Sequence, residues 1–172
     1  MSWKDVYFEV PIIPRGQGRP RIGNRRAFKD RKDIIYEMEI REAFEKKYPD
    51  WDPVLEPVSV YIRASYEAPK SWSKKNKTIL WIREHIWKTS TPDLDNICKS
   101  VLDAMSQAHF WKDDAQVIRL SAAKFYHISE GPQLSVHIIN EEQADGLEEK
   151  PLRELLQMKE IIAREEEEDA DA

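Results

Sequence analysis

Three aspartates in the segment TPDLDNICKSVLDAMSQAHFWKDD, residues 91 to 114, have the types and spacing of a site for a hard metal ion. Asp93 and Asp95 alternate with a leucine at the end of an expected extended stretch, which predicts that both side chains point to the same side. Asp114 follows a helix-like segment and can return a third carboxylate to this pair. Mg2+ is bound by a few carboxylates and keeps water positions that a phosphate substrate can take. The pattern therefore indicates a magnesium site for phosphate chemistry.

The chemistry of such a site follows from its charges. Two carboxylates about 4 Å apart repel by roughly 1 kcal/mol in water-like surroundings and by about 4 kcal/mol at an effective dielectric of 20. A divalent ion removes this repulsion and lowers the pKa of a coordinated water. Lys99 lies one helical turn after Asp95 and can reach the same side, either to hold a phosphate or to orient the attacking water. The plainer interpretation is a surface ion pair between Lys99 and Asp103, worth only tenths of a kcal/mol.

Positive charge is clustered in two further segments. The stretch from residue 14 to 32, PRGQGRPRIGNRRAFKDRK, has eight basic side chains against Asp30 alone, and its glycines and prolines predict a loop. A smaller cluster of lysines surrounds Trp72. Like charges at this density repel unless a partner neutralises them, so contact with a phosphate backbone is expected, the alternative being a solvated surface. The candidate DNA-contacting residues are Arg15, Arg19, Arg21, Arg25, Arg26, Lys29, Lys74 and Lys75.

The net charge of −5 conceals two parts of opposite charge. Residues 141–172 contain 13 acidic and 4 basic side chains, whereas residues 1–140 contain 19 acidic and 23 basic ones. The sequence thus predicts a domain over 1–140 and an acidic tail over 141–172. Apolar residues at helical spacing precede an acidic run in this tail. It is expected either to dock as a partly helical segment on a dimer of this chain or on another protein partner, or to be disordered and compete with DNA for the basic segment.

Several classes of protein are excluded by composition. No apolar run has the length needed to span a bilayer, and no leader is seen at Met1, so neither membrane insertion nor secretion is expected. Cys98 is the single cysteine, which excludes an internal disulfide and a zinc site, and it is expected to be buried and inert. These features are typical of a protein of the reducing cytoplasm.

Hydrophobic periodicity predicts the elements that must position these residues. Alternation predicts strands over residues 6–10 and 58–66, and apolar residues every four positions predict a helix over 36–48. A second helix is expected after Asp95, with Asp95 or Asn96 as its N-cap. Residues 117–126 and 133–139 are expected to form a hairpin, whereas 71–87 is ambiguous. The order predicts a single α+β domain with a mixed β-sheet packed with helices. Four aromatic residues are expected in the core rather than as base-stacking surfaces: Trp72, Trp87, Phe110 and Trp111.

Four short strings in this order resemble one protein family. They are GRPR at 18–21, SWSKK at 71–75, PDLDN at 92–96 and WKDDAQV at 111–117. Each string alone is a weak signal, but together, at this spacing, they resemble the RusA-type Holliday-junction resolvases, crossover junction endodeoxyribonucleases of phages and prophages. The resemblance covers residues 6 to 139.

The resemblance implies roles for particular residues. The metal-binding aspartates of the family correspond to Asp93, Asp95 and Asp114, and its catalytic lysine corresponds to Lys99. Asp113 is then a neighbour of the site rather than a ligand. The family is expected to act with Mg2+ as a homodimer, whose twofold symmetry presents two sites to a four-way DNA junction. The implied location is the cytoplasm of a bacterial or phage-infected cell.

Two functional classes follow from these observations. The first is a magnesium-dependent, structure-selective endodeoxyribonuclease that resolves four-way junctions by paired symmetric nicks, through attack of metal-activated water on the phosphodiester. The second is a non-catalytic module that binds branched DNA, in which the carboxylates only cap a helix. The residues do not distinguish junctions from flaps, forks or D-loops as the nuclease substrate.

Overall fold

The computed structural model describes residues 3–18, 21–23, 26–128 and 131–143, with the backbone alone for 21–23, 26–28 and 143. It confirms the predicted single α+β domain with a mixed sheet. The elements are, in chain order, β1 (Asp5–Val10), β2 (Arg21–Gly23), β3 (Arg26–Phe28), α1 (Arg31–Lys47), β4 (Val58–Glu67), α2 (Lys74–Arg83), β5 (His85–Trp87), α3 (Leu94–Gln107), the short 3-10 helix η1 (Asp114–Gln116), β6 (Val117–His127), β7 (Gln133–Asn140) and η2 (Glu141–Gln143).

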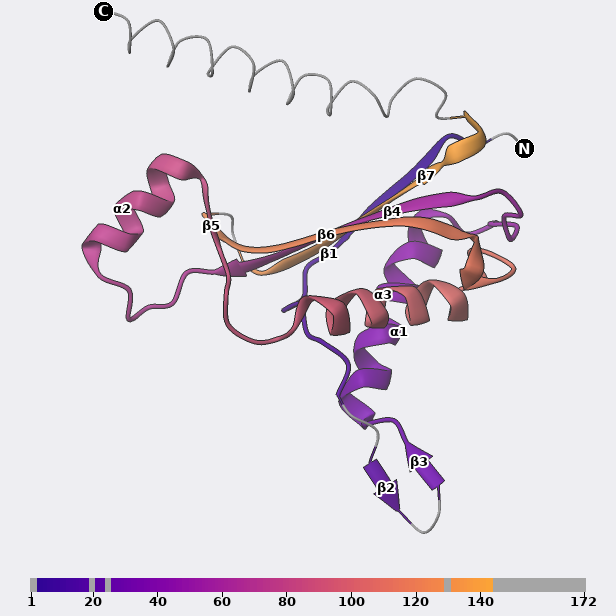
Figure 1. The fold of residues 1–172 in the computed structure, drawn as a ribbon, viewed down its shortest axis with the longest axis horizontal. Helices are drawn as coiled ribbons and strands as arrows, with labels where there is room; N and C mark the ends of the chain where they lie inside the picture. Colours follow the sequence, from indigo (N-terminus) through magenta and orange to yellow (C-terminus); the bar gives the residue numbers. More distant parts are fainter. Residues whose placement is uncertain (1–2, 19–20, 24–25, 129–130, 144–172) are drawn as a thin grey trace, which may run out of the picture.

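Five strands form the main sheet in the order β1-β7-β4-β6-β5. The β4–β6 pair is parallel, and the other three pairs are antiparallel. Helices α1 and α3 cover one face of this sheet (Figure 1). Because α3 lies in the crossover between the parallel strands β4 and β6, the chain places it directly on the sheet.

The core lies between this sheet and the two helices. On the helix-covered face, β4 contributes Val60 and Ile62, which are almost fully buried. The helices contribute apolar side chains at the predicted spacing, such as Ile40 of α1 and Val101 of α3, both inaccessible to solvent. The alternating and helical periodicities of the sequence are therefore confirmed as the two sides of one core.

The expected hairpin of the last two strands is wrong. β6 and β7 are present, but each pairs with β4, which lies between them. Periodicity and a turn signal indicate two strands and a chain reversal, and they carry no information about a third strand that separates the pair. β4 takes the central position because its side chains are buried along most of its length.

The segment expected to be a loop between residues 14 and 32 contains a small hairpin. β2 pairs with β3 in antiparallel register, with Arg21 opposite Phe28. α1 then begins at Arg31, and the Asp30 side chain caps it by accepting a hydrogen bond from the Lys32 amide at 2.9 Å.

The ambiguous stretch resolves into α2 and β5. The Ser73 side chain caps α2 by accepting from the Asn76 amide, and Glu84 ends the helix in the left-handed region at φ 62°. Within α2 only Leu80 is buried, and the helix projects from one end of the sheet (Figure 1). None of the described helices combines the length and apolar character needed to cross a membrane. The predicted acidic tail lies outside the described residues beyond Gln143.

Candidate active site

The first two aspartates of the motif lie at the N-terminus of α3. Asp93 is the N-cap residue, with an extended backbone, and its carboxylate accepts no capping hydrogen bond. Asp95 is in the first turn of the helix. Both side chains are exposed. The expected N-cap at Asp95 or Asn96 is thus wrong by two or three positions, and the pair is not on a strand, because the helix already begins at Leu94.

Lys99 lies one turn further along α3 and is exposed. The alternative ion pair with Asp103 is not found, because the Asp103 carboxylate accepts hydrogen bonds from Lys29 at 2.9 Å and from the Gln17 side chain at 3.0 Å. Within the described part of the chain, no hydrogen bond or ion pair engages the Lys99 ammonium. The first turns of α3 therefore present two exposed carboxylates, Asp93 and Asp95, and the exposed Lys99 ammonium.

A lysine outside the motif holds the backbone just before Asp93. The Lys124 ammonium of β6 donates to the carbonyls of Ser90 at 2.9 Å and Pro92 at 2.6 Å. No local sequence signal marks Lys124, because its partners are brought close only by the packing of α3 on β6. Two charge-assisted hydrogen bonds fix the segment that leads into the aspartate pair.

An aromatic platform supports the same segment. The Lys88 ammonium lies over the rings of Tyr66 and Tyr126, at 5.1 and 5.5 Å from their centroids. Trp72 packs edge-on against Tyr126, with ring centroids 4.8 Å apart. The Tyr66 hydroxyl donates to the Pro14 carbonyl at 2.8 Å, and burial raises the pKa of this phenol. The platform thus joins the start of the basic segment to the turn that carries Asp93.

Gly16 allows the basic segment to approach α3 closely. The Gln17 amide donates to the Asn96 carbonyl at 3.1 Å. A Cβ atom at Gly16 would lie 2.7 Å from the Cβ of Asn96 and 3.3 Å from that of Pro92, which is too close for any other residue without displacement. The close approach to Asn96 and Pro92, beside the two aspartates, therefore explains why residue 16 is a glycine.

Two of the candidate DNA-contacting residues are engaged inside the fold. Arg15 pairs with the buried carboxylate of Asp33 at 2.9 Å. Lys29 pairs with the buried Glu37 and, at 2.9 Å, with Asp103. Burial alone would lower the pKa of Lys29, but the bonds from Glu37 and Asp103 outweigh it and raise that pKa, so the ammonium stays charged. DNA contact by Arg15 and Lys29 stays a prediction. Such contact would have to compete with their ion pairs to Asp33, Glu37 and Asp103.

The other candidates are spread over the chain. Lys74 and Lys75 are exposed in the first turn of α2. Arg21 and Arg26 lie in β2 and β3, where the structure describes the backbone but not the side chains. Arg19 and Arg25 lie outside the described residues.

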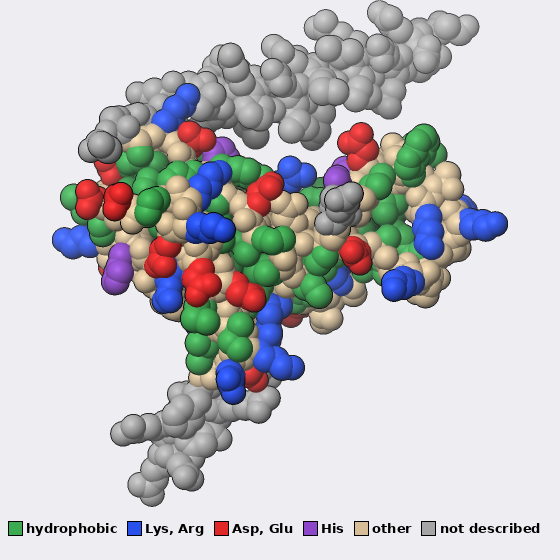
Figure 2. Space-filling model, turned by 180° about the vertical axis from the view of Figure 1, so that it is seen from behind, with side chains coloured by type: hydrophobic (Ala, Val, Ile, Leu, Met, Phe, Trp, Pro, Cys, Tyr) green, Lys and Arg blue, Asp and Glu red, His purple; other side chains and the backbone are tan. Residues whose placement is uncertain are grey.

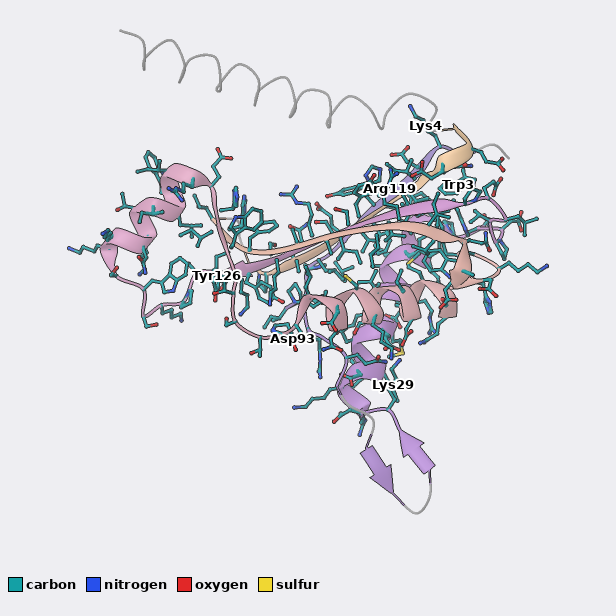
Figure 3. The ribbon with its side chains drawn as sticks, in the orientation of Figure 1. Trp3, Lys4, Lys29, Asp93, Arg119 and Tyr126 are labelled. Atoms are coloured by element: carbon teal, nitrogen blue, oxygen red, sulfur yellow. The ribbon has the colours of Figure 1, made fainter. Side chains whose placement is uncertain are left out.

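The third aspartate lies at the other end of α3. Asp113 accepts a bond from the Ala115 amide at 2.8 Å and caps η1, whereas Asp114 is exposed. The Gln116 side chain ties η1 to the Val54 carbonyl at 2.9 Å, near the start of β4. Figure 3 shows Asp93 at one end of α3, and Figure 1 shows β6 beginning at the other. With 14 residues at 1.5 Å each, α3 separates the two ends by about 21 Å.

The described chain does not gather a three-carboxylate metal cage. Among residues 3–18, 21–23, 26–128 and 131–143, no three His, Cys, Asp or Glu side chains lie close enough to hold one ion. Asp93 and Asp95 fit the carboxylate chemistry of a Mg2+ site that keeps several waters. Asp114 of the same chain does not fit that site, because a rigid helix keeps it away.

Predictions for the other singled-out side chains have mixed outcomes. Cys98 is buried as expected, and burial, with a smaller effect of the Asp95 charge, raises the pKa of its thiol. Phe110 and Trp111 are core residues, with 0% and 3% exposed surface. The same prediction is wrong for Trp87, which is 62% exposed on the short edge strand β5.

Comparisons with known proteins agree with the motifs. The family described as endodeoxyribonuclease RusA matches residues 11–139. The chain is 31% identical over 137 residues to the uncharacterized protein YqaN of Bacillus subtilis (strain 168), covering 77% of this chain and 94% of that protein. It is 27% identical over 124 residues to the crossover junction endodeoxyribonuclease rusA of Lactococcus phage r1t, covering 67% of this chain and 81% of the phage protein. With a match that spans most of its length, the chain belongs to the RusA family of endodeoxyribonucleases.

Proposed function

We propose that this protein is a magnesium-dependent, structure-selective endodeoxyribonuclease that resolves four-way DNA junctions by paired symmetric nicks. The observation that carries the proposal is the N-terminus of α3, where Asp93 and Asp95 are exposed and Lys99 follows one turn later without a partner in the described structure. The family and the name of the phage relative support this reaction.

Each residue has a proposed task. Asp93 and Asp95 would bind the ion, which when bound would supply an activated water and neutralise negative charge on the phosphate oxygens. An exposed ammonium without a carboxylate partner is suited to hold an oxygen of the scissile phosphate, and we assign this role to Lys99. Lys124 would keep the aspartate pair in place from behind. The basic side chains of the 14–32 segment and of α2 would contact the DNA backbone, which makes binding depend on salt.

A second copy of the chain would supply the third carboxylate. In the described structure no strand pairs with residues 117–123 of β6 on their outer side. Ile118 and Leu120 on this stretch are 61% and 44% exposed. A free strand edge with exposed apolar side chains is a template for pairing with another strand. Antiparallel pairing of two β6 edges about a twofold axis would bring Asp114 of one chain near Asp93 of the other.

The reaction is tested with a synthetic four-way junction, with and without Mg2+. We expect paired symmetric nicks only with the metal. Asp93→Asn should reduce cutting by roughly a thousandfold, because an ion that contributes several kcal/mol to the transition state is lost, while binding of the junction survives. Loss of binding together with cutting would count against metal ligation by Asp93.

A mixed dimer tests whether the site is shared between chains. Two differently tagged chains, one with Asp93→Asn and the other with Asp114→Asn, are purified as the heterodimer. A shared site leaves one of the two centres intact, so the heterodimer should cut one strand of the junction, whereas either homodimer cuts none. If each centre were built within one chain, the heterodimer would be inactive as well.

The non-catalytic alternative remains the second candidate, because one chain does not gather three carboxylates among its described residues. It predicts that junctions are bound but stay uncut at any Mg2+ concentration. The same assay compares junctions with flaps, forks and D-loops. We place the protein in the cytoplasm of a bacterial or phage-infected cell, where branched DNA is formed.

A further inference from the structure

A hollow of about 560 Å3 lies between α2 and β5. Its lining includes two indole rings, Trp72 and Trp87, and two polar side chains, Asn76 and Arg83. No carboxylate lines it. Its volume is within the range of cavities that hold small organic groups.

The two indole rings line the hollow, and each packs against a different neighbouring ring. Trp72 is held by its edge-on contact with Tyr126, at 4.8 Å, while Trp87 contacts the ring of His85 at 4.8 Å. Among the described ring contacts none joins Trp72 to Trp87, so the space between them is not filled by their own packing. Trp87 stays 62% exposed in spite of its size. An exposed aromatic face beside a hollow offers a stacking surface to a planar ligand.

The polar lining narrows the ligand class. An asparagine amide offers a donor and an acceptor, and a guanidinium offers a planar set of donors, which is the combination that recognises the edge of a nucleobase. Aromatic side chains supply the stacking for bases that are not paired. α2 has no acidic residue and carries Lys74, Lys75 and Lys77, so a negatively charged backbone is favoured beside the hollow.

Figure 2, seen from behind, shows blue lysine and arginine side chains next to green hydrophobic ones at the end of the molecule that carries α2. This mixture fits a nucleic acid, which presents both phosphates and bases.

The hollow is also connected to the candidate active site. β5 ends at Trp87, and the next residues, from Lys88 to Pro92, form the segment held by Lys124 in front of Asp93. Six residues of extended chain reach at most about 20 Å. Figure 3 shows Tyr126, the ring that supports Trp72, at the same end of α3 as Asp93. A base held in the hollow would thus lie within a few nucleotides of the cut phosphate.

We propose that the hollow between α2 and β5 binds an unpaired nucleobase of the branched DNA, stacked on Trp87 and read by Asn76 and Arg83. This inference rests on the proposed function. It gives the enzyme a way to depend on the base near the branch point in addition to the shape of the junction. Cutting would then be most efficient at junctions that present a matching base to this site.

The test is a double-mutant cycle between the protein and the DNA. Full-length protein carrying Asp93→Asn, which binds without cutting, is titrated with junctions that lack one base at successive positions around the branch. The same series is repeated with Trp87→Ala added. At the position whose base occupies the hollow, either change alone should weaken binding by roughly 5- to 150-fold, and the two together should weaken it no further.

The chain offers a matched control in Trp81, which belongs to the same end of the molecule, is 73% exposed, and lines a different hollow. Trp81→Ala should show no coupling with any missing base. Trp87→Phe keeps a stacking face and should retain most of the binding. Asn76→Ala, in the cutting-competent protein, should alter the base preference at the coupled position and leave the overall preference for junctions over linear duplex unchanged.

The outcomes separate the inference from the proposed function. Coupling at one position that is confined to Trp87 supports the hollow as a base site. If the junction is bound and cut but no position couples to Trp87, the base site is wrong and the nuclease assignment stands. If branched DNA is not preferred over linear duplex, both fail.

Discussion

Lys124 acts on the candidate site from a strand that is 32 residues beyond Pro92 in the chain. Its ammonium donates to the backbone carbonyls of both Ser90 and Pro92. A hydrogen bond from a charged group contributes more than a neutral one, roughly 1.5–3 kcal/mol. We therefore regard Lys124 as a positioning residue, which fixes the backbone of the segment that ends at Asp93.

Lys124→Met removes both hydrogen bonds and keeps most of the length of the side chain. We expect about tenfold slower cutting at limiting Mg2+ and a higher Mg2+ concentration for half-maximal rate, because the aspartate pair is less well ordered. Junction binding without metal should not change. Rates measured across a Mg2+ titration, together with a binding curve in EDTA, check this expectation.

Lys124→Arg preserves the charge and the donors and should recover part of the rate. Lys46→Met, at an exposed position in the last turn of α1, is the control and should have no effect. An unchanged Mg2+ dependence in Lys124→Met, with a normal fold, would show that the hydrogen bonds to Ser90 and Pro92 do not position the site.

At the scale of elements, α3 and β6 determine which groups can meet. Asp93 lies at the N-terminus of α3, and Asp114 begins η1 beyond its C-terminus. β6 runs beside it with an open edge over residues 117–123. Among the described residues the three aspartates do not form one group, so the proposed metal site requires a second copy of the chain to contribute Asp114.

The free edge of β6 gives the element-scale prediction. Leu120→Glu would place two like charges near the twofold axis of an antiparallel β6 pair, and we expect the proposed dimer to dissociate. Because Leu120 is already 44% exposed, the fold of each chain should survive. Sedimentation or light scattering measures the mass, and junction cutting should be lost together with the dimer.

The control for this change is Ile34→Glu, at a position on α1 with similar exposure, 51%. It should leave both the proposed dimer and the proposed junction cutting in place. A Leu120→Glu protein that remains a fully active dimer would exclude the β6 edge as the interface.

At the scale of the whole molecule, opposite charges are separated along the chain. Residues 144–172 hold 11 acidic and 4 basic side chains. Removing them changes the formal net charge from −5 to +2. The boundary for such a truncation is best placed after Gln143, because Glu141 still donates its amide to the Pro57 carbonyl and belongs to the fold.

Truncation after Gln143 is expected to strengthen junction binding several-fold at low salt, because a segment that competes with phosphates for the basic surface is removed. Binding curves at several salt concentrations measure the effect, which should shrink as salt rises. Replacing Glu165 to Glu168 by glutamine in the full chain should reproduce part of it. Loss of solubility or of the dimer would instead indicate that this segment docks on the protein.

Much of the fold was predictable because local periodicity reports burial. The strands β1, β4, β6 and β7 and the helices α1 and α3 follow from apolar residues at spacings of two and of three to four. Strand order was not predictable, since the β4 strand between β6 and β7 is chosen by packing of the whole sheet. Nor could local sequence indicate that Asp33 and Glu37, buried on α1, hold Arg15 and Lys29.

The sequence by itself determined the family, the α+β class and the chemical types at the site, because the residues that carry them are contiguous strings such as PDLDN and KDD. Only the tertiary structure decided how these strings meet. It placed Asp93 at the N-cap of α3 without a capping hydrogen bond from its side chain, and Lys124 against the backbone that precedes it. It also left Trp87 exposed beside a hollow and separated Asp114 from Asp93 by the length of α3. The reason is physical: residue types fix what chemistry is available, whereas distances between distant segments depend on which faces pack together to bury the core.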